Sequence, residues 1–109
     1  MRLEHTQPGD AGEIIDFLRT VFQADADAPF LAPATIQWKY FTPRPDWVGS
    51  RSYVFREDGR IVARGCVIPI ALPLAAGDVR TISVVDWAAA ASIRGIGRWT
   101  AEMFLIFHL

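Results

Sequence analysis

Residues 51–70 read RSYVFREDGRIVARGCVIPI, and this stretch decides the fold. Tyr53 and Phe55 occupy alternate positions, a period of two that is typical of a β-strand. Glu57-Asp58-Gly59 follows, and an Asp-Gly pair between two such runs indicates a tight hairpin turn. The sequence therefore predicts a strand from Arg51, a turn, and a second strand from Arg60 to about Ile70.

The sequence after this hairpin predicts a third strand. Gly77-Asp78 reads as another turn, and the segment from Val79 to about Trp87 is rich in β-branched residues. Pro69 and Pro73 cannot donate ladder hydrogen bonds, so the second strand must bulge or lie at an edge near them.

The sequence before the hairpin predicts a short strand at Arg2 to Thr6 and then a helix to about Gln23. Asp10 and Glu13 are placed to cap this helix as a capping-box-like pair. Its apolar residues recur at three-to-four spacing, which suits packing on a sheet, and they are Ile14, Ile15, Leu18, Val21 and Phe22.

A second, short helix is expected from Pro33, a residue favoured at the first helical position. Pro43 and Pro45 should end it. Its aromatic and apolar residues are Ile36, Trp38, Tyr40 and Phe41. The resulting order of strand, two helices and three strands indicates an α+β fold with an antiparallel meander.

Length and composition are those of a single globular domain, residues 1–109. Hydrophobic residues make up 51% of the chain, and the formal net charge of -1 provides no general attraction to nucleic acid or anionic membrane. Cys66 is the only cysteine, which excludes an intrachain disulfide and a multi-cysteine zinc site and favours a cytoplasmic location. No apolar run is long enough to span a membrane, so no membrane partner is expected.

A glycine-containing turn, Arg94-Gly95-Ile96-Gly97-Arg98, is expected between the last strand and a terminal helix. Glycines let the backbone approach a ligand closely, and the free amides and dipole of a helix start favour an anion such as phosphate. A Gly-x-Gly turn of this kind also occurs as a simple connection.

From about residue 2 to residue 100 the sequence resembles the GNAT superfamily of N-acetyltransferases. The order of elements is similar, and so are Trp38-Lys39-Tyr40-Phe41, the hairpin from Arg51 to Pro69, and Val84-Val85-Asp86-Trp87-Ala88 leading to Arg94-Gly95-Ile96-Gly97. The resemblance implies a truncated GNAT-like mixed or antiparallel sheet with packed helices, ending in the glycine loop and a terminal helix.

The resemblance also implies acetyl-CoA as the cofactor, an acyl-CoA-type small molecule. Arg94, Gly95, Ile96, Gly97 and Arg98 would then bind its pyrophosphate, while the segment from Asp86 to Ala88 would flank the pantetheine and acetyl group. Asp86 is the candidate catalytic base, and its alternative role is to cap the following turn.

Two departures from the family pattern affect this interpretation. Trp99 stands where the loop of the family ends in a small residue, and the chain ends at Leu109, within the helix after the loop. The family continues through further strands and a helix, which often supply a tyrosine acid. We therefore expect acetyl-CoA binding with little or no catalysis.

A second resemblance overlaps the first. Ile93 to Met103 is similar to the helix-hairpin-helix of alkylpurine DNA glycosylases, in which Gly-Ile-Gly is followed by Trp-Thr-Ala. It implies a nucleic-acid partner bound through its backbone phosphate as the alternative function. The chain would then be composite, with a GNAT-like part at 1–92 and a glycosylase-like tail at 93–109, and an inactive fusion or engineered chimera is the remaining interpretation.

The last turns of the chain are apolar on nearly every side, and such a helix must be buried. We expect a homo-oligomer with Phe104, Ile106, Phe107 and the strand edge near Val84 in its interface. Among the remaining residues, Cys66 is expected in the core. Arg60 and Arg64 point the same way along a regular strand and are expected on a solvated face.

Overall fold

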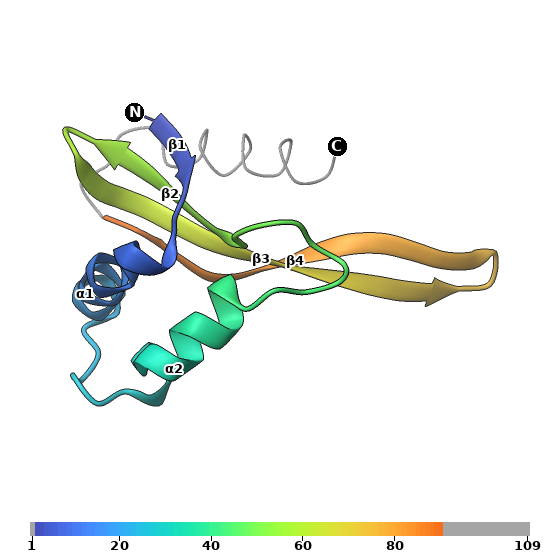
Figure 1. Ribbon diagram of the computed structural model, residues 1–109, viewed down its shortest axis with the longest axis horizontal. Coiled ribbons are helices and arrows are strands. Elements are labelled where there is room, and N and C mark those ends of the chain that lie inside the picture. Colours follow the sequence, from blue (N-terminus) through green and yellow to red (C-terminus); the bar gives the residue numbers. More distant parts are fainter. Residues whose placement is uncertain (1, 91–109) are drawn as a thin grey trace.

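Four consecutive strands form an antiparallel sheet in the computed structural model, which describes residues 2–90 (Figure 1). The order across the sheet is β1-β2-β3-β4, so each strand pairs with its neighbour in sequence. The strands are β1 (Arg2–His5), β2 (Ser52–Glu57), β3 (Arg60–Leu74) and β4 (Gly77–Ala89). The predicted α+β fold with an antiparallel meander is confirmed.

The helical segments lie between β1 and β2 in the sequence. They are a 3-10 turn (Pro8–Asp10), α1 (Ala11–Phe22), a second 3-10 turn (Pro29–Leu31), α2 (Pro33–Ile36) and a π-helical segment (Gln37–Phe41) that continues α2. The two predicted helices are therefore confirmed, and the second does begin at Pro33 and ends before Pro43.

The hairpin between β2 and β3 has the turn that the sequence predicts. Asp58 and Gly59 both have positive φ angles, 52° and 77°, and Glu57 pairs with Arg60. Two successive positive φ angles are the signature of the type I′ turn, whose twist matches that of the flanking strands.

The hairpin between β3 and β4 extends well beyond β2. Ser52, the first residue of β2, pairs with Cys66, and the Val67 N–H still donates to the Arg51 carbonyl oxygen. From Ile68 to Leu74 the described pairing of β3 is with β4. This places Pro69 and Pro73 in a part of β3 with one open edge, as predicted. The turn itself lies two residues earlier than expected, because Gly77, with φ of 121°, begins β4 opposite Leu74 instead of forming the turn.

The two helices share one hydrophobic core with the sheet, and Figure 1 shows both on the same side of it. Ile14 and Leu18 of α1 and Ile36 of α2 are fully buried and belong to one cluster with Val54 and Cys66. The three-to-four apolar spacing thus predicted the buried stripe of α1 correctly.

The predicted cap of α1 is wrong. The carboxylate of Asp10 accepts a hydrogen bond from the backbone N–H of Gln7 at 2.8 Å, which closes the preceding 3-10 turn, and it makes no side-chain cap of α1. Glu13 accepts two hydrogen bonds from Arg56 instead. A long-range charged partner outcompetes the local capping bond here.

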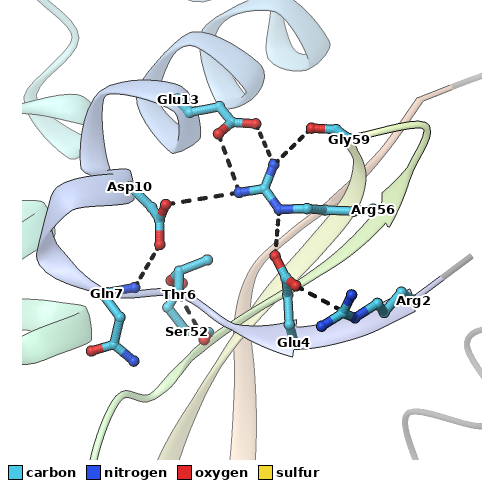
Figure 2. A network of polar contacts seen from close by, with 9 residues as sticks. All are labelled: Arg2, Glu4, Thr6, Gln7, Asp10, Glu13, Ser52, Arg56 and Gly59. Atoms are coloured by element: carbon cyan, nitrogen blue, oxygen red, sulfur yellow. Dashed lines mark hydrogen bonds and ion pairs between the residues drawn. The ribbon is translucent and has the colours of Figure 1, made fainter.

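Arg56 joins the first part of the chain to the hairpin (Figure 2). Its guanidinium donates to Glu4 of β1, to Glu13 of α1 and to the carbonyl oxygen of Gly59, and it lies 3.8 Å from Asp10. Hydrogen bonding to Glu13, followed by that to Glu4, raises the pKa of Arg56 above its ordinary value. This network fixes β1 and the start of α1 against β2.

Candidate functional site

The candidate site lies at an irregularity in β4. Cys66 pairs with Val85 and Arg64 pairs with Ala88, so Asp86 and Trp87 together stand opposite the single residue Gly65. Asp86 has a φ of 50°, which side-chain-bearing residues seldom adopt. This is a β-bulge, a feature that redirects side chains and is enriched beside active sites.

The bulge directs the carboxylate of Asp86 to the segment that follows α2. Its Oδ2 atom accepts a hydrogen bond from Nζ of Lys39 at 2.8 Å and another from the hydroxyl of Tyr40 at 2.6 Å. The Asp86 side chain keeps 17% of its surface exposed and that of Lys39 keeps 18%. Most of the surface of the two side chains is therefore shielded from bulk water, and a small part of each remains accessible to solvent.

Arg64 lies beneath this pair, with no exposed surface. Its guanidinium donates to the hydroxyl of Tyr40 at 2.9 Å, to the backbone oxygen of Asp86 at 2.9 Å and to Oγ of Ser52 at 2.8 Å. It also stacks on the Tyr40 ring, 4.4 Å from the ring centroid. One buried cation thus connects β2, β3, the bulge and the helical segment.

The expectation that Arg64 shares a solvated face with exposed Arg60 is wrong. Phe55 pairs with Ala63 and Arg56 with Ile61, which leaves Val62 as an extra residue in β3. One inserted residue reverses the alternation of side chains along a strand. Arg60 therefore reaches solvent, and Arg64, four residues on, enters the core.

Arg51 fixes the backbone of the same helical segment. It is 1% exposed, and it donates to the carbonyl oxygens of Lys39 at 2.9 Å and Trp38 at 3.1 Å. Burial lowers its pKa below the ordinary value. These bonds satisfy carbonyl groups near the end of the π-helical segment and hold Lys39 and Tyr40 opposite the bulge.

The site carries more positive than negative charge. Lys39 contacts the carboxylate of Asp86, Arg64 donates to the backbone oxygen of Asp86, and Arg51 donates to the backbone of Lys39. Nη1 of Arg51 and Nε of Arg64 are buried without a hydrogen-bond partner among the described residues. Buried donors of this kind are uncommon in folded proteins, so the site has unused hydrogen-bonding capacity.

The neutral groups of the site stay neutral at physiological pH. Burial raises the pKa of the Tyr40 phenol well above its ordinary value, although nearby Arg64 acts in the opposite direction. Burial also raises the pKa of Cys66 to about 11, so this fully buried residue is a thiol, as expected for a small core residue. Tyr40 can accordingly donate its hydroxyl hydrogen to the Asp86 carboxylate and orient it.

Two of the predicted site residues lie within the described chain. Asp86 and Ala88 are at the bulge, where Ala88 is buried opposite Arg64, and the described bonds of the Asp86 carboxylate go to Lys39 and Tyr40. The phosphate loop (Arg94, Gly95, Ile96, Gly97 and Arg98) lies outside the described residues, as do the glycosylase-like tail and Phe104, Ile106 and Phe107 of the expected interface.

Sequence reasoning did not assign Lys39, Arg51 or Arg64 to the site. The signal available was a charged residue within an otherwise apolar strand, Arg64 beside Gly65 and Cys66. Tyr40 was expected in the core, and it is indeed fully buried. Within residues 2–90 no group of three or more histidine, cysteine, aspartate or glutamate side chains is arranged to hold a metal ion, and none of the helices there could cross a bilayer.

Comparisons with known proteins bear on the fold. No protein-family model and no curated protein matches the chain. Among solved structures, a conserved protein of Enterococcus faecalis V583, a probable N-acyltransferase, superposes with a TM-score of 0.68 at 15% identity. The match covers 96% of this chain and 25% of that one, so the chain spans a quarter of the length of that protein.

Two further matches span more of their partners. A predicted acetyltransferase from Clostridium acetobutylicum, crystallised with acetyl-CoA, has a TM-score of 0.63 at 10% identity over 96% of this chain and 70% of that one. A ribosomal-protein-alanine N-acetyltransferase from Brucella melitensis biovar Abortus 2308 has a TM-score of 0.58 at 22% identity over 97% and 69%. The chain therefore has the α+β fold of the GNAT N-acetyltransferases.

Proposed function

We propose that the chain binds an acyl-CoA, acetyl-CoA in the first instance, along β4 as part of a GNAT-type N-acyltransferase site. The observation that carries the proposal is the bulge at Asp86, which places a largely buried carboxylate on the strand that leads to the glycine loop. The shared fold with an acetyltransferase crystallised with acetyl-CoA supports it.

The described part of β4 suits the pantetheine arm of such a ligand. This strand is the last in the described sheet, so its outer edge does not pair with another described strand. Pantetheine contains two amide groups, which can hydrogen-bond to a strand edge as a peptide does. Ala88, Ala89 and Ala90 carry only small side chains at the end of this strand.

Each group of the site has a separate role in this proposal. The backbone amides of Arg94 to Arg98, with their two guanidinium groups, bind the pyrophosphate. Asp86 binds the acceptor amine and takes its proton as general base. Tyr40 holds the Asp86 carboxylate in place, and Arg64 holds the Asp86 backbone. The bound thioester supplies the activated acyl group. We propose binding of the acyl-CoA as the principal activity of residues 1–109.

Calorimetric titration tests the proposal. Acetyl-CoA should bind to the protein, and a short DNA duplex should not. The Arg94→Ala variant should weaken acetyl-CoA binding about tenfold, because a charge-assisted phosphate contact contributes about 1.5 kcal/mol or more. Arg80→Ala, which removes an exposed arginine earlier on β4, is the matched control and should bind as the parent does.

The opposite pattern would overturn the proposal. Binding of the duplex with a steep dependence on salt, without binding of acetyl-CoA, would identify the glycine hairpin as a nucleic-acid site. If neither acetyl-CoA nor the duplex binds, the proposed function is wrong.

A further inference from the structure

The ammonium group of Lys39 is already paired with the carboxylate of Asp86. Nζ of Lys39 lies 2.8 Å from Oδ2 of Asp86 and 5.8 Å from the centroid of the Tyr40 ring. A carboxylate beside an aromatic ring is a favourable environment for any alkylammonium, because both groups attract a cation. The fold therefore displays, with its own lysine, the kind of group that Asp86 can bind.

Lys39 is the exchangeable cation among the three positively charged side chains of the site. Arg51 and Arg64 are 1% and 0% exposed, and each guanidinium makes two or more hydrogen bonds to fixed groups. The Lys39 side chain reaches solvent and makes one described hydrogen bond, to Asp86. Its backbone is held by Arg51, so the side chain can leave without rearrangement of the fold.

Charge balance requires such an exchange. A cationic ligand added beside Lys39 and Arg64 would increase the positive excess around the Asp86 carboxylate. A ligand that replaces Lys39 exchanges one ammonium for another and leaves the net charge unchanged. An anionic ligand on Asp86 would be repelled by the carboxylate itself.

We propose that Asp86 is the binding site for the primary ammonium group of an alkylamine acceptor, and that Lys39 occupies this site until the acceptor displaces it. The role of the bound amine as acceptor rests on the proposed acyltransferase function, whereas its binding does not. Lys39 thereby keeps the carboxylate paired in the absence of ligand and selects for amines that can compete with it.

Titration of the full chain with n-propylamine at neutral pH tests this inference, with the ¹³C carboxyl signal of Asp86 as the readout. Lys39→Met removes the ammonium and retains an apolar chain, so this variant should bind propylammonium at least about tenfold more tightly than the parent, since an occupied site lowers apparent affinity. Lys39→Arg retains a competing cation and should bind as weakly as the parent.

Asp86→Asn should abolish binding in both backgrounds, and propionate and propanol should not bind. Equal affinity in the parent and Lys39→Met, or binding that survives Asp86→Asn, would overturn the inference. If Lys39→Met does not fold, the parent protein still decides the matter, because propylamine must move the ¹³Cε signal of Lys39 as its side chain is released. An unmoved signal at saturating amine contradicts the proposal.

The result can be separated from that of the acyl-CoA proposal by titrating acetyl-CoA against the same samples. Amine exchange without acetyl-CoA binding would refute the proposed function and leave the ammonium site standing. Acetyl-CoA binding without amine exchange would refute the ammonium site alone.

Discussion

The ammonium of Lys39 lies 2.8 Å from the carboxylate of Asp86, although 47 positions separate the two residues in the chain. The contact depends on two backbone irregularities. The π-helical segment Gln37–Phe41 presents Lys39 and Tyr40 on the sheet side, and the bulge in β4 turns Asp86 towards them. Local deviations from regular structure thus create the candidate site.

Arg64 should be the most sensitive polar residue of the fold. Arg64→Met removes the donor for buried Tyr40 and Ser52 and for the part-buried carbonyl oxygen of Asp86. We expect a loss of about 3 kcal/mol in the free energy of unfolding, because three hydrogen bonds to a charged donor are lost at buried or part-buried acceptors. Urea denaturation measures the loss, and exposed Arg60→Met is the control, with an expected change within about 0.5 kcal/mol. Equal stability of the two variants would contradict the described network.

Arg56 should contribute to stability through the contacts in Figure 2. Its side chain is 18% exposed and bonds to Glu4, Glu13 and Gly59, so Arg56→Ala should cost about 1 to 2 kcal/mol, of which the exposed Glu13 contact supplies the smaller share. Arg2→Ala removes an arginine with an 84% exposed side chain and should change little. Urea denaturation at low and high salt tests both, and a loss of stability that is equal for the two variants would exclude the proposed joining role of Arg56.

Cys66 should make stability fall with rising pH above about 9. The thiol has a pKa of about 11 in the folded protein and an ordinary value of 9.0, so the unfolded chain releases its proton first. The contribution is fully present below pH 9 and is lost between pH 9 and 11, by about 3 kcal/mol. Cys66→Ala should lack this part of the slope. Parallel pH profiles of the two proteins would show that the thiol does not titrate as described.

Two glycine substitutions should have opposite effects. Gly59→Ala places a side chain at φ of 77° in the hairpin turn and should cost about 1 kcal/mol. Gly12→Ala lies in α1, where an added Cβ meets nothing within 4 Å, and should stabilise the protein by about 0.5 to 1 kcal/mol. Thermal unfolding of both variants provides the comparison, in which a stabilised Gly59→Ala protein would contradict the assigned turn.

The extent to which the sequence predicted this structure follows from the range of the interactions involved. The β2–β3 turn was predictable because Asp58 and Gly59 determine it by their own backbone preferences. The burial of Arg64 was not, because it depends on the extra residue Val62, which the packing of two strands accommodates. Family resemblance predicts Asp86 as a candidate site residue, but its partner Lys39 comes from a distant segment that no local pattern connects to it.

Backbone amide NMR of the full chain during titration with acetyl-CoA tests the central claim most directly, because it locates the ligand as well as detecting it. We expect the largest shifts at Asp86 to Ala88 and at Gly95 to Arg98, with little change at the distant network of Arg56. Saturable binding whose shifts avoid the Asp86 bulge, or the absence of any shift at millimolar acetyl-CoA, would contradict the account.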